Sequence, residues 1–365
     1  MLASEIVPER WTEERVNAWY AEQPWPVGAN FVPSTAINQL EMWQAESFDP
    51  DAIDRELGWA ASIGMNSMRV FLHDLAYRED PEGFCDRVDE YLAIADRHGV
   101  STLIVFFDGV WNPTPSPGPQ PAPRPGVHNS GWVQSPGAEL LADPTRYAEL
   151  KPYVQDVLRR FRDDPRVLGW DLFNEPDNYQ GRTFAKALPA DEKHDRACDL
   201  VLAAFRWARE VHPSQPLTVG VWGDRDWLNN PKRIDTISFE NSDVISFHNY
   251  QPSPEAQTNI RRIAEHFDRP ILCTEYMARG ARSTFEGVLP ALQENRIGAY
   301  NWGLVSGKSQ TIYPWHSWST PFDTEPAEWF HDIFRPNGEP YRQDEAALIK
   351  RLTGELNAAP ANRPR

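Results

Sequence analysis

The feature that most constrains the fold of this chain is an alternation of eight short apolar segments with longer amphipathic ones. The apolar segments are β-branched or aromatic and are bounded by Gly, Pro or Asp, as buried strands usually are. They lie at residues 26–32, 66–72, 101–107, 168–173, 216–222, 243–248, 270–275 and 297–304. Because eight strands that alternate with helices are typical of a (β/α)8 TIM barrel, we predict an α/β fold of this kind.

An open, doubly wound sheet is the alternative arrangement of alternating strands and helices. Such a sheet usually carries a glycine-rich phosphate-binding turn after its first strand. The corresponding stretch here, GANFVPS at residues 28–34, is not such a turn. The closed barrel is therefore favoured.

Capping residues mark the helices between the strands. Two helices are predicted over residues 49–64 and 80–99, where Asp-Pro opens each segment and Gly follows its last turn. A third helix is predicted to start at Asp143–Pro144. Residues 283–286 have the pattern of a capping box that opens a fourth.

Two long loops interrupt the alternation, at residues 108–142 after the third strand and 305–335 after the eighth. Both contain several aromatic residues, which favours a lid or a wall of a functional site over a linker between domains. A barrel of this size commonly forms one domain. We therefore predict a single catalytic domain over residues 1–365, with the barrel at about 25–305 and a long loop, last helix and tail at 306–365.

Composition excludes several classes of protein and partner. The 365 residues are 41% hydrophobic, which excludes a disordered chain, and the formal net charge of −17 argues against nucleic acid or anionic membranes as partners. No apolar run reaches the length of a membrane span, and the N-terminal stretch lacks the pattern of a signal peptide. We therefore expect no membrane partner and a cytoplasmic location.

Cysteine and histidine spacing gives no sign of a metal or cofactor. Cys85, Cys198 and Cys273 are far apart and lack zinc or redox spacing, so we predict reduced thiols in the core. Metal-dependent hydrolases on this fold usually carry His-x-His on the first strand, and PVGANFVPS carries no such ligand. We therefore expect no metal and no cofactor, and the oligomeric state is left open.

Polar and aromatic residues gather where the predicted strands end. In such barrels the carboxyl ends of the strands share one mouth, where the chemistry takes place. Two of these residues are carboxylates, Glu175 and Glu275, after strands four and seven. One protonated and one ionised carboxyl group in a common cavity suit cleavage of a glycosidic bond. The other strand-end candidates are Arg69, Asp108, Asn174, Trp222, His248, Tyr250 and Trp302.

Four of these strand ends carry a family resemblance. The motifs NEP at 174–176, HNY at 248–250, TEY at 274–276 and the tryptophan at 302 resemble clan A glycoside hydrolases, most nearly glycoside hydrolase family 5. The resemblance spans the barrel. It implies a carbohydrate substrate, Glu175 as acid/base and Glu275 as nucleophile, and hydrolysis with retention by double displacement. The two carboxyl groups are then expected about 5–5.5 Å apart.

The same resemblance implies roles for the neighbours of the glutamates. Asn174 would bind the sugar 2-hydroxyl and Trp302 would stack on the sugar ring. Residues that would orient or tune the carboxylates are Arg69, His248 and Tyr250. Asp171 is interpreted separately, as a buried partner for an arginine.

The third strand departs from the family pattern. Many members offer a histidine at its end, whereas VFFDGVW offers Asp108. Trp111 and His128 are candidates to fill part of that space, and Trp222 lies after the fifth strand. The tryptophans expected on loops, and therefore considered as sugar platforms, are Trp43, Trp111, Trp132, Trp315 and Trp318.

Two alternative functions remain at this point. One is a carbohydrate-binding barrel that has lost catalysis, which the missing strand-three histidine and the many aromatic residues favour. The other is a transglycosylase, whose long loops would exclude water. The sequence leaves the sugar, its linkage, and exo or endo action open.

Overall fold

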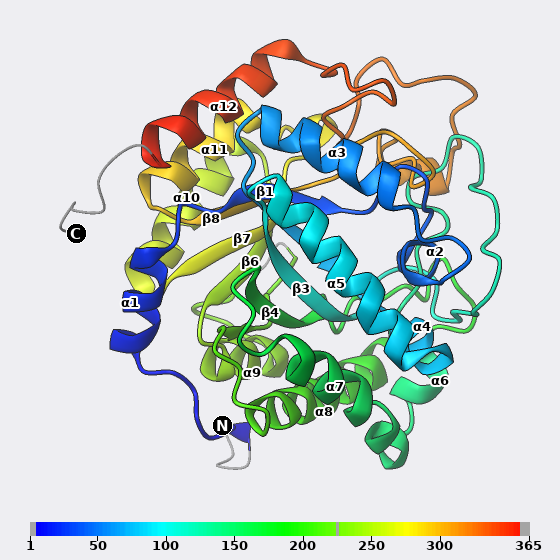
Figure 1. Cartoon of the computed structure of the whole chain (residues 1–365), viewed down its shortest axis with the longest axis vertical. Coiled ribbons are helices and arrows are strands. Elements are labelled where there is room, and N and C mark those ends of the chain that lie inside the picture. The colour runs from blue at the N-terminus through cyan, green and yellow to red at the C-terminus, as the bar shows by residue number, and fades with distance from the viewer. Residues whose placement is uncertain (1–4, 224–225, 358–365) are drawn as a thin grey trace.

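The computed structural model describes residues 5–223 and 226–357, and its centre is a barrel of parallel strands (Figure 1). The strands pair in the order β5-β4-β3-β2-β1-β8-β7-β6. A bridge between Val221 and Phe247 brings the segment after β5 next to β6, so the barrel is nearly closed. The strands are β1 (Val27–Phe31), β2 (Ser67–Phe71), β3 (Ser101–Asp108), β4 (Val167–Asn174), β5 (Leu217–Thr218), β6 (Ile245–Asn249), β7 (Ile271–Tyr276) and β8 (Gly298–Trp302). The predicted (β/α)8 barrel is confirmed.

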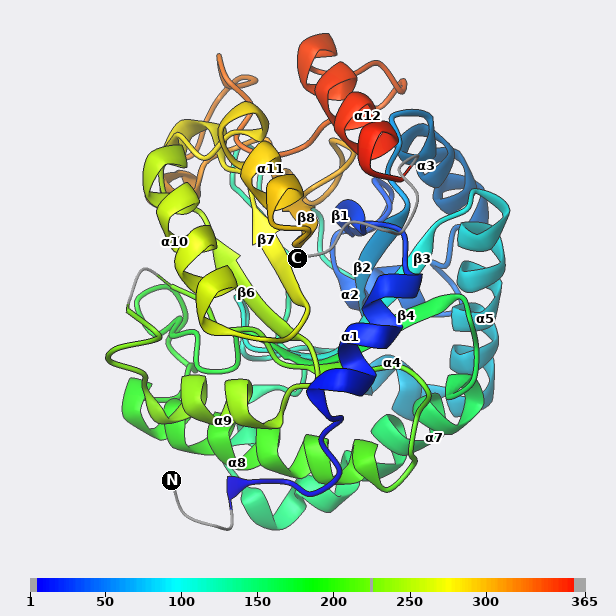
Figure 2. The ribbon, with the colours of Figure 1, turned by 90° about the vertical axis from the view of Figure 1, so that its left-hand side faces the viewer.

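Helices surround the strands, as Figures 1 and 2 show. Short 3-10 turns, η2 (Pro144–Glu149), η3 (Arg279–Ala281) and η4 (Trp315–Trp318), lie in the loops. The α-helices are α1 (Glu13–Glu22), α2 (Gln39–Trp43), α3 (Pro50–Ser62), α4 (Asp74–Glu79), α5 (Pro81–Arg97), α6 (Ala138–Leu141), α7 (Lys151–Phe161), α8 (Ala190–Arg209), α9 (Arg233–Asn241), α10 (Ser253–His266), α11 (Phe285–Glu294) and α12 (Gln343–Asn357). The predicted tail at 358–365 lies outside the described residues.

Helix α1 covers the amino ends of the strands (Figure 2). Trp11, Val16 and Tyr20 form one buried cluster with inward-facing residues from the barrel, among them Leu103 of β3 and Leu272 of β7. This apolar plug closes the end of the barrel opposite to the strand-end residues. The open, chemically useful end is therefore the carboxyl end, as the sequence predicts.

The predicted caps are partly right. Asp49 and Asp80 accept hydrogen bonds from the backbone N–H groups of Ala52 and Gly83 and open α3 and α5 as expected. The predicted capping box at 283–286 is wrong by one residue, because Thr284 is the N-cap and accepts from the N–H of Gly287.

The helix expected from Asp143–Pro144 is also interrupted. Asp143 opens only the 3-10 turn η2, and α7 starts afresh at Lys151. Pro152 explains the break, since it has no N–H to continue the hydrogen-bond ladder of the preceding turn.

The fifth strand is much shorter than the predicted 216–222. Its backbone leaves the ladder after Thr218, because the N–H of Val219 donates to the side chain of Ser242 instead of a strand carbonyl. Pairing resumes only at the Val221–Phe247 bridge.

The structure also bears on the predictions about the cysteine thiols and about membrane spans. Cys85, Cys198 and Cys273 are free and buried, as predicted. In the part of the chain that the structure describes, every helix is too short or too polar to cross a membrane. The cytoplasmic location stays a prediction.

Candidate active site

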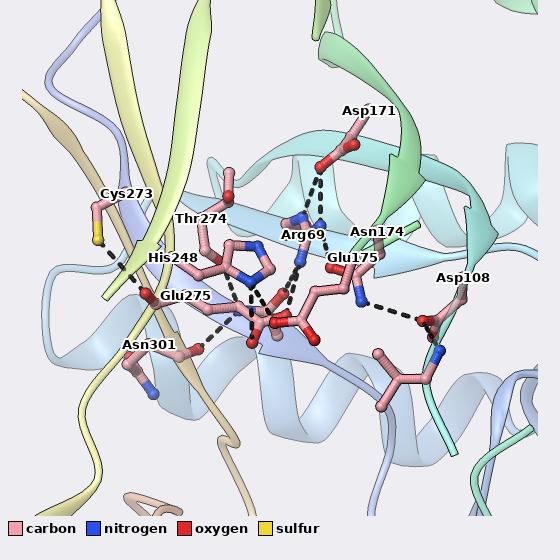
Figure 3. Close-up of polar contacts among 12 residues, drawn as sticks. Arg69, Asp108, Asp171, Asn174, Glu175, His248, Cys273, Thr274, Glu275 and Asn301 are labelled. Carbon is pink, nitrogen blue, oxygen red and sulfur yellow. Dashed lines mark hydrogen bonds and ion pairs between the residues drawn. The ribbon is translucent and has the colours of Figure 1, made fainter. Parts of the chain in front are cut away.

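The fold brings Glu175 and Glu275 together, although they are far apart in the sequence. Glu175 directly follows β4, and Glu275 lies near the end of β7. One carboxylate oxygen of each and Nδ1 of His248 all lie within 4.8 Å of one another. Figure 3 shows the two carboxylates facing each other with the His248 ring beside them. All three side chains line a cavity of about 450 Å³, a size typical of small-ligand sites.

Glu175 reaches the cavity through an unusual backbone conformation. Its φ of 41° lies in the left-handed region, which is costly for a residue with a side chain and is found most often at functional sites. Gly109 stabilises this turn, because its N–H donates to the Asn174 carbonyl at 2.9 Å. A Cβ at Gly109 would lie 2.2 Å from the Glu175 carbonyl oxygen, so only glycine fits there.

Arg69 supports both strand ends from inside the barrel. Its guanidinium donates to Asp171 at 2.8 Å, to Asn174 Oδ1 at 2.8 Å and to Glu275 Oε1 at 3.3 Å (Figure 3). Burial disfavours its charge, but Asp171 and Glu275 outweigh burial and raise its pKa. The predicted pairing of Asp171 with an arginine is confirmed. Arg69 is fully buried and lies beneath the cavity rather than in its lining.

The two glutamates have different neighbours. Tyr250 donates its hydroxyl hydrogen to Glu275 Oε2 at 2.8 Å, and Arg69 contacts the other oxygen of the same carboxylate. Glu175 instead accepts from Asn178 Nδ2 at 2.5 Å and contacts His248 Nδ1 at 2.7 Å. The cation and the hydroxyl therefore both favour a negative charge on Glu275.

Burial shifts the pKa values of Glu175, Glu275 and His248. It raises the pKa of Glu175 and of Glu275 to about 7 each, and it lowers the pKa of His248 to about 4, so His248 is neutral near pH 7. Two carboxyl groups this close resist carrying two charges at once. Together with the contacts above, this favours an ionised Glu275 beside a protonated Glu175.

The comparison with known families agrees with this geometry. The family model for cellulases, glycosyl hydrolase family 5, matches residues 56–307. The chain belongs to glycosyl hydrolase family 5. The predicted family is thus confirmed.

Individual relatives are more distant. A probable mannan endo-1,4-β-mannosidase of Aspergillus terreus is 29% identical over 96 residues, which cover 26% of this chain and 22% of that protein. The exo-β-1,4-mannosidase Op5Man5 from an Opitutaceae bacterium has a TM-score of 0.61 at 18% identity, over 91% of this chain and 60% of that one. The endo-β-1,4-mannanase from Thermotoga petrophila has a TM-score of 0.58 at 16% identity, over 93% and 78%. At these identities the two structures show a shared fold.

Asp108, the departure on strand three of this family 5 member, is buried behind the cavity. It accepts hydrogen bonds from Trp132 Nε1 at 2.6 Å, from Gln39 Nε2 at 3.0 Å and from Asn174 Nδ2 at 3.0 Å. Burial raises its pKa to about 7. Asp108, one of the strand-end candidates for contact with a substrate, instead lies where it orients the Asn174 amide.

The predicted aromatic residues divide into those in the cavity lining and those behind it. Trp315 is 40% exposed, and Trp302 is half-buried and meets Phe71 and Trp132 edge-on. The predicted residues that line the cavity are Asn174, Glu175, His248, Tyr250, Glu275, Trp111, His128, Trp222, Trp302 and Trp315.

Three of the loop tryptophans considered as platforms do not line the cavity. Trp43 is not on a loop but is fully buried in α2, where its Nε1 donates to the Phe71 carbonyl. Trp132 is buried and bonded to Asp108, and Trp318 stacks behind Trp111 at 5.0 Å. These positions depend on loop packing, which the local sequence does not encode.

Several lining residues were not predicted. Asn178 and Gln180 follow the NEP motif closely, so their proximity to Glu175 was a usable signal. Asn129 and His331 come from the two long loops, away from any strand end, and carry no strand-end signal.

The donor set Glu175, His248 and Glu275 is compact enough for its three ligand atoms to contact one cation. The same three side chains already have protein partners: His248 Nδ1 lies 2.7 Å from Glu175 Oε1, Asn178 donates to Glu175 Oε2, and Tyr250 donates to Glu275 Oε2. The expected absence of a metal stays a prediction.

Proposed function

We propose that this chain is a retaining β-glycosidase in which Glu175 is the acid/base and Glu275 the nucleophile. The observation that carries the proposal is that one oxygen of each carboxylate lies within 4.8 Å of one oxygen of the other. Retaining enzymes hold their carboxyl groups about 5–5.5 Å apart, whereas inverting enzymes need about 6.5–9.5 Å to admit a water molecule.

In the first step a Glu275 oxygen attacks the anomeric carbon while Glu175 gives its proton to the leaving oxygen. The glycosidic bond breaks and an ester bond to Glu275 forms. In the second step ionised Glu175 takes a proton from water, and the water oxygen attacks the anomeric carbon and displaces Glu275. Both carboxyl groups return to their starting protonation states.

Neighbouring residues would support these steps. Tyr250 and Arg69 stabilise Glu275 as a carboxylate, which it must be to attack and to leave. Asn174 uses its Oδ1 and one amide hydrogen for Arg69 and Asp108, so the other amide hydrogen is available to a sugar 2-hydroxyl. Trp302, half-buried in the lining, offers an apolar face to the ring.

We propose β-linked mannosides as the substrate class. The supporting observation is that the similar proteins reported above are named as mannosidases or mannanases. An inactive carbohydrate-binding barrel is the weaker alternative, since both carboxylates and their hydrogen-bond partners are present in one cavity. No observation favours a transglycosylase over a hydrolase.

Proton NMR of the reaction in its first minutes tests this proposal. We expect 4-nitrophenyl β-mannoside to be hydrolysed, faster than the β-glucoside, with the β-anomer of the sugar as first product. Glu275→Gln should abolish turnover, while Glu286→Gln, an exposed change on α11, should leave it intact. An α-anomeric first product, or full activity of Glu275→Gln, would refute the mechanism.

A further inference from the structure

The two long loops are joined to each other across one side of the barrel mouth. The N–H of Asn129 donates to the Ser309 carbonyl at 2.8 Å, and the N–H of His128 donates to Ser317 Oγ at 2.8 Å. Trp111 from the first loop stacks on Trp318 from the second at 5.0 Å and an interplanar angle of 16°. We call these joined segments, residues 108–142 and 305–335, the wall.

The wall fills the space above the first two strands. Behind Trp302 lies a second, small cavity of about 10 Å³, lined by Phe31 at the end of β1, by Phe71 at the end of β2 and by Asn129 of the wall. That volume is about enough for one water molecule. The main cavity therefore does not continue past Trp302 as a groove over β1 and β2.

Two buried side chains of the wall have polar atoms without hydrogen-bond partners. His331 Nδ1 lies 2.7 Å from the Met277 carbonyl, so Nδ1 carries the hydrogen and Nε2 is an acceptor; Nε2 has no partner. Neither polar side-chain atom of Asn129 has a partner, although the residue is 1% exposed. Both residues line the main cavity. Buried polar atoms without partners are rare, and a ligand is one way to satisfy them.

The positions of the two glutamates give the direction in which a substrate would lie. Glu175 protonates the leaving oxygen, so the leaving group departs on the β4 side. If Trp302 is the platform for the sugar that Glu275 attacks, as proposed above, this sugar lies over β8, which is next to β1 in the sheet. The non-reducing end of the substrate therefore meets the wall.

We propose that the wall makes the enzyme exo-acting, so that it removes one sugar at a time from the non-reducing end of short β-linked oligosaccharides. His331 Nε2 accepts a hydrogen bond from a hydroxyl of the terminal sugar, and the Asn129 amide binds a second hydroxyl. This inference rests on the proposed function and specifies its mode of action.

The test uses β-1,4-manno-oligosaccharides of four to six sugars that are labelled at the reducing end. At early times we expect free monosaccharide and a labelled product shorter by one sugar. Labelled products shorter by two or more, formed at the initial rate, would refute exo action while leaving the glycosidase proposal intact. A lack of hydrolysis of these oligosaccharides and of aryl β-glycosides would refute both.

Variants test the two wall residues. Asn129→Gly, which suits the φ of 47° at this position, and His331→Ala should each lower kcat/KM about 10- to 100-fold and weaken inhibition by the free monosaccharide to a similar extent. His316→Ala, an exposed histidine of the same loop, is the matched control. Circular dichroism checks that the variants fold. Folded variants with unchanged kcat/KM and unchanged product inhibition would refute the assignment of these residues.

Discussion

At the scale of single residues, the site gives two chemically identical carboxyl groups different protonation states. Both are buried, which raises the pKa of each to about 7. Of the two carboxyl groups, Glu275 is the one that Arg69 and Tyr250 contact, whereas Glu175 lies 2.7 Å from Nδ1 of the neutral His248 ring. These contacts, more than burial, determine which carboxyl group is ionised.

The pH dependence of kcat/KM should therefore be bell-shaped. Activity should rise with pH as Glu275 loses its proton and fall at higher pH as Glu175 loses its own. In Glu175→Gln the alkaline limb should disappear, whereas the acid limb should stay near its place, because Glu175 is already uncharged when Glu275 loses its proton.

A dinitrophenyl glycoside makes this measurable, because its leaving group needs no protonation. With this substrate Glu175→Gln should keep its kcat/KM, which reports the first step, lose the alkaline limb and retain the acid limb. An alkaline limb that persists in Glu175→Gln would mean that another group is the acid.

At the scale of elements, the end of β4 and the start of the loop after β3 act as one unit. Gly109 lies so close to Glu175 that any side chain must displace the glutamate backbone. We expect Gly109→Ala to lower kcat by about 100-fold, since an ångström of misplacement is enough for a loss of that size.

Gly118→Ala is the matched control in the same loop. Gly118 has a φ of 88° and no neighbour within 4 Å of an added Cβ, so its substitution adds backbone strain without touching the site. Kinetics and thermal unfolding of both variants separate the two effects. Equal losses of kcat would contradict the role given to Gly109.

The elements also show what the sequence can and cannot predict. Glu175 and Glu275 could be placed in one site because carboxyl ends of parallel strands share an edge. The early end of β5 could not be predicted, since it depends on the hydrogen bond from the N–H of Val219 to the Ser242 side chain. His331 and Asn129 were missed for the same reason, because their positions follow from contacts between loops far apart in sequence.

At the scale of the whole molecule, the barrel is closed at one end by α1 and open at the other. Trp11 is buried at the closed end, in the cluster that contains Leu103 and Leu272. We expect Trp11→Ala to lower the free energy of unfolding by about 3 kcal/mol, as large-to-small changes in a core do, with kcat and KM unchanged.

Denaturant unfolding and steady-state kinetics check this prediction. Ile6→Ala, a change at an exposed position of the same N-terminal segment, should have little effect on either. A large change in kcat for a stable, folded Trp11→Ala would mean that the two ends of the barrel are coupled.

The central claim is that Glu175 and Glu275 act on one anomeric carbon, with Glu275 as the attacking group. Mass spectrometry of the protein after reaction with a 2-deoxy-2-fluoro-β-glycosyl fluoride tests it most directly, because this reagent slows the second step and traps the ester. We predict one fluoroglycosyl group per chain, on the peptide that contains Glu275. A label on the peptide of Glu175, or none on an enzyme that hydrolyses its substrate, would contradict it.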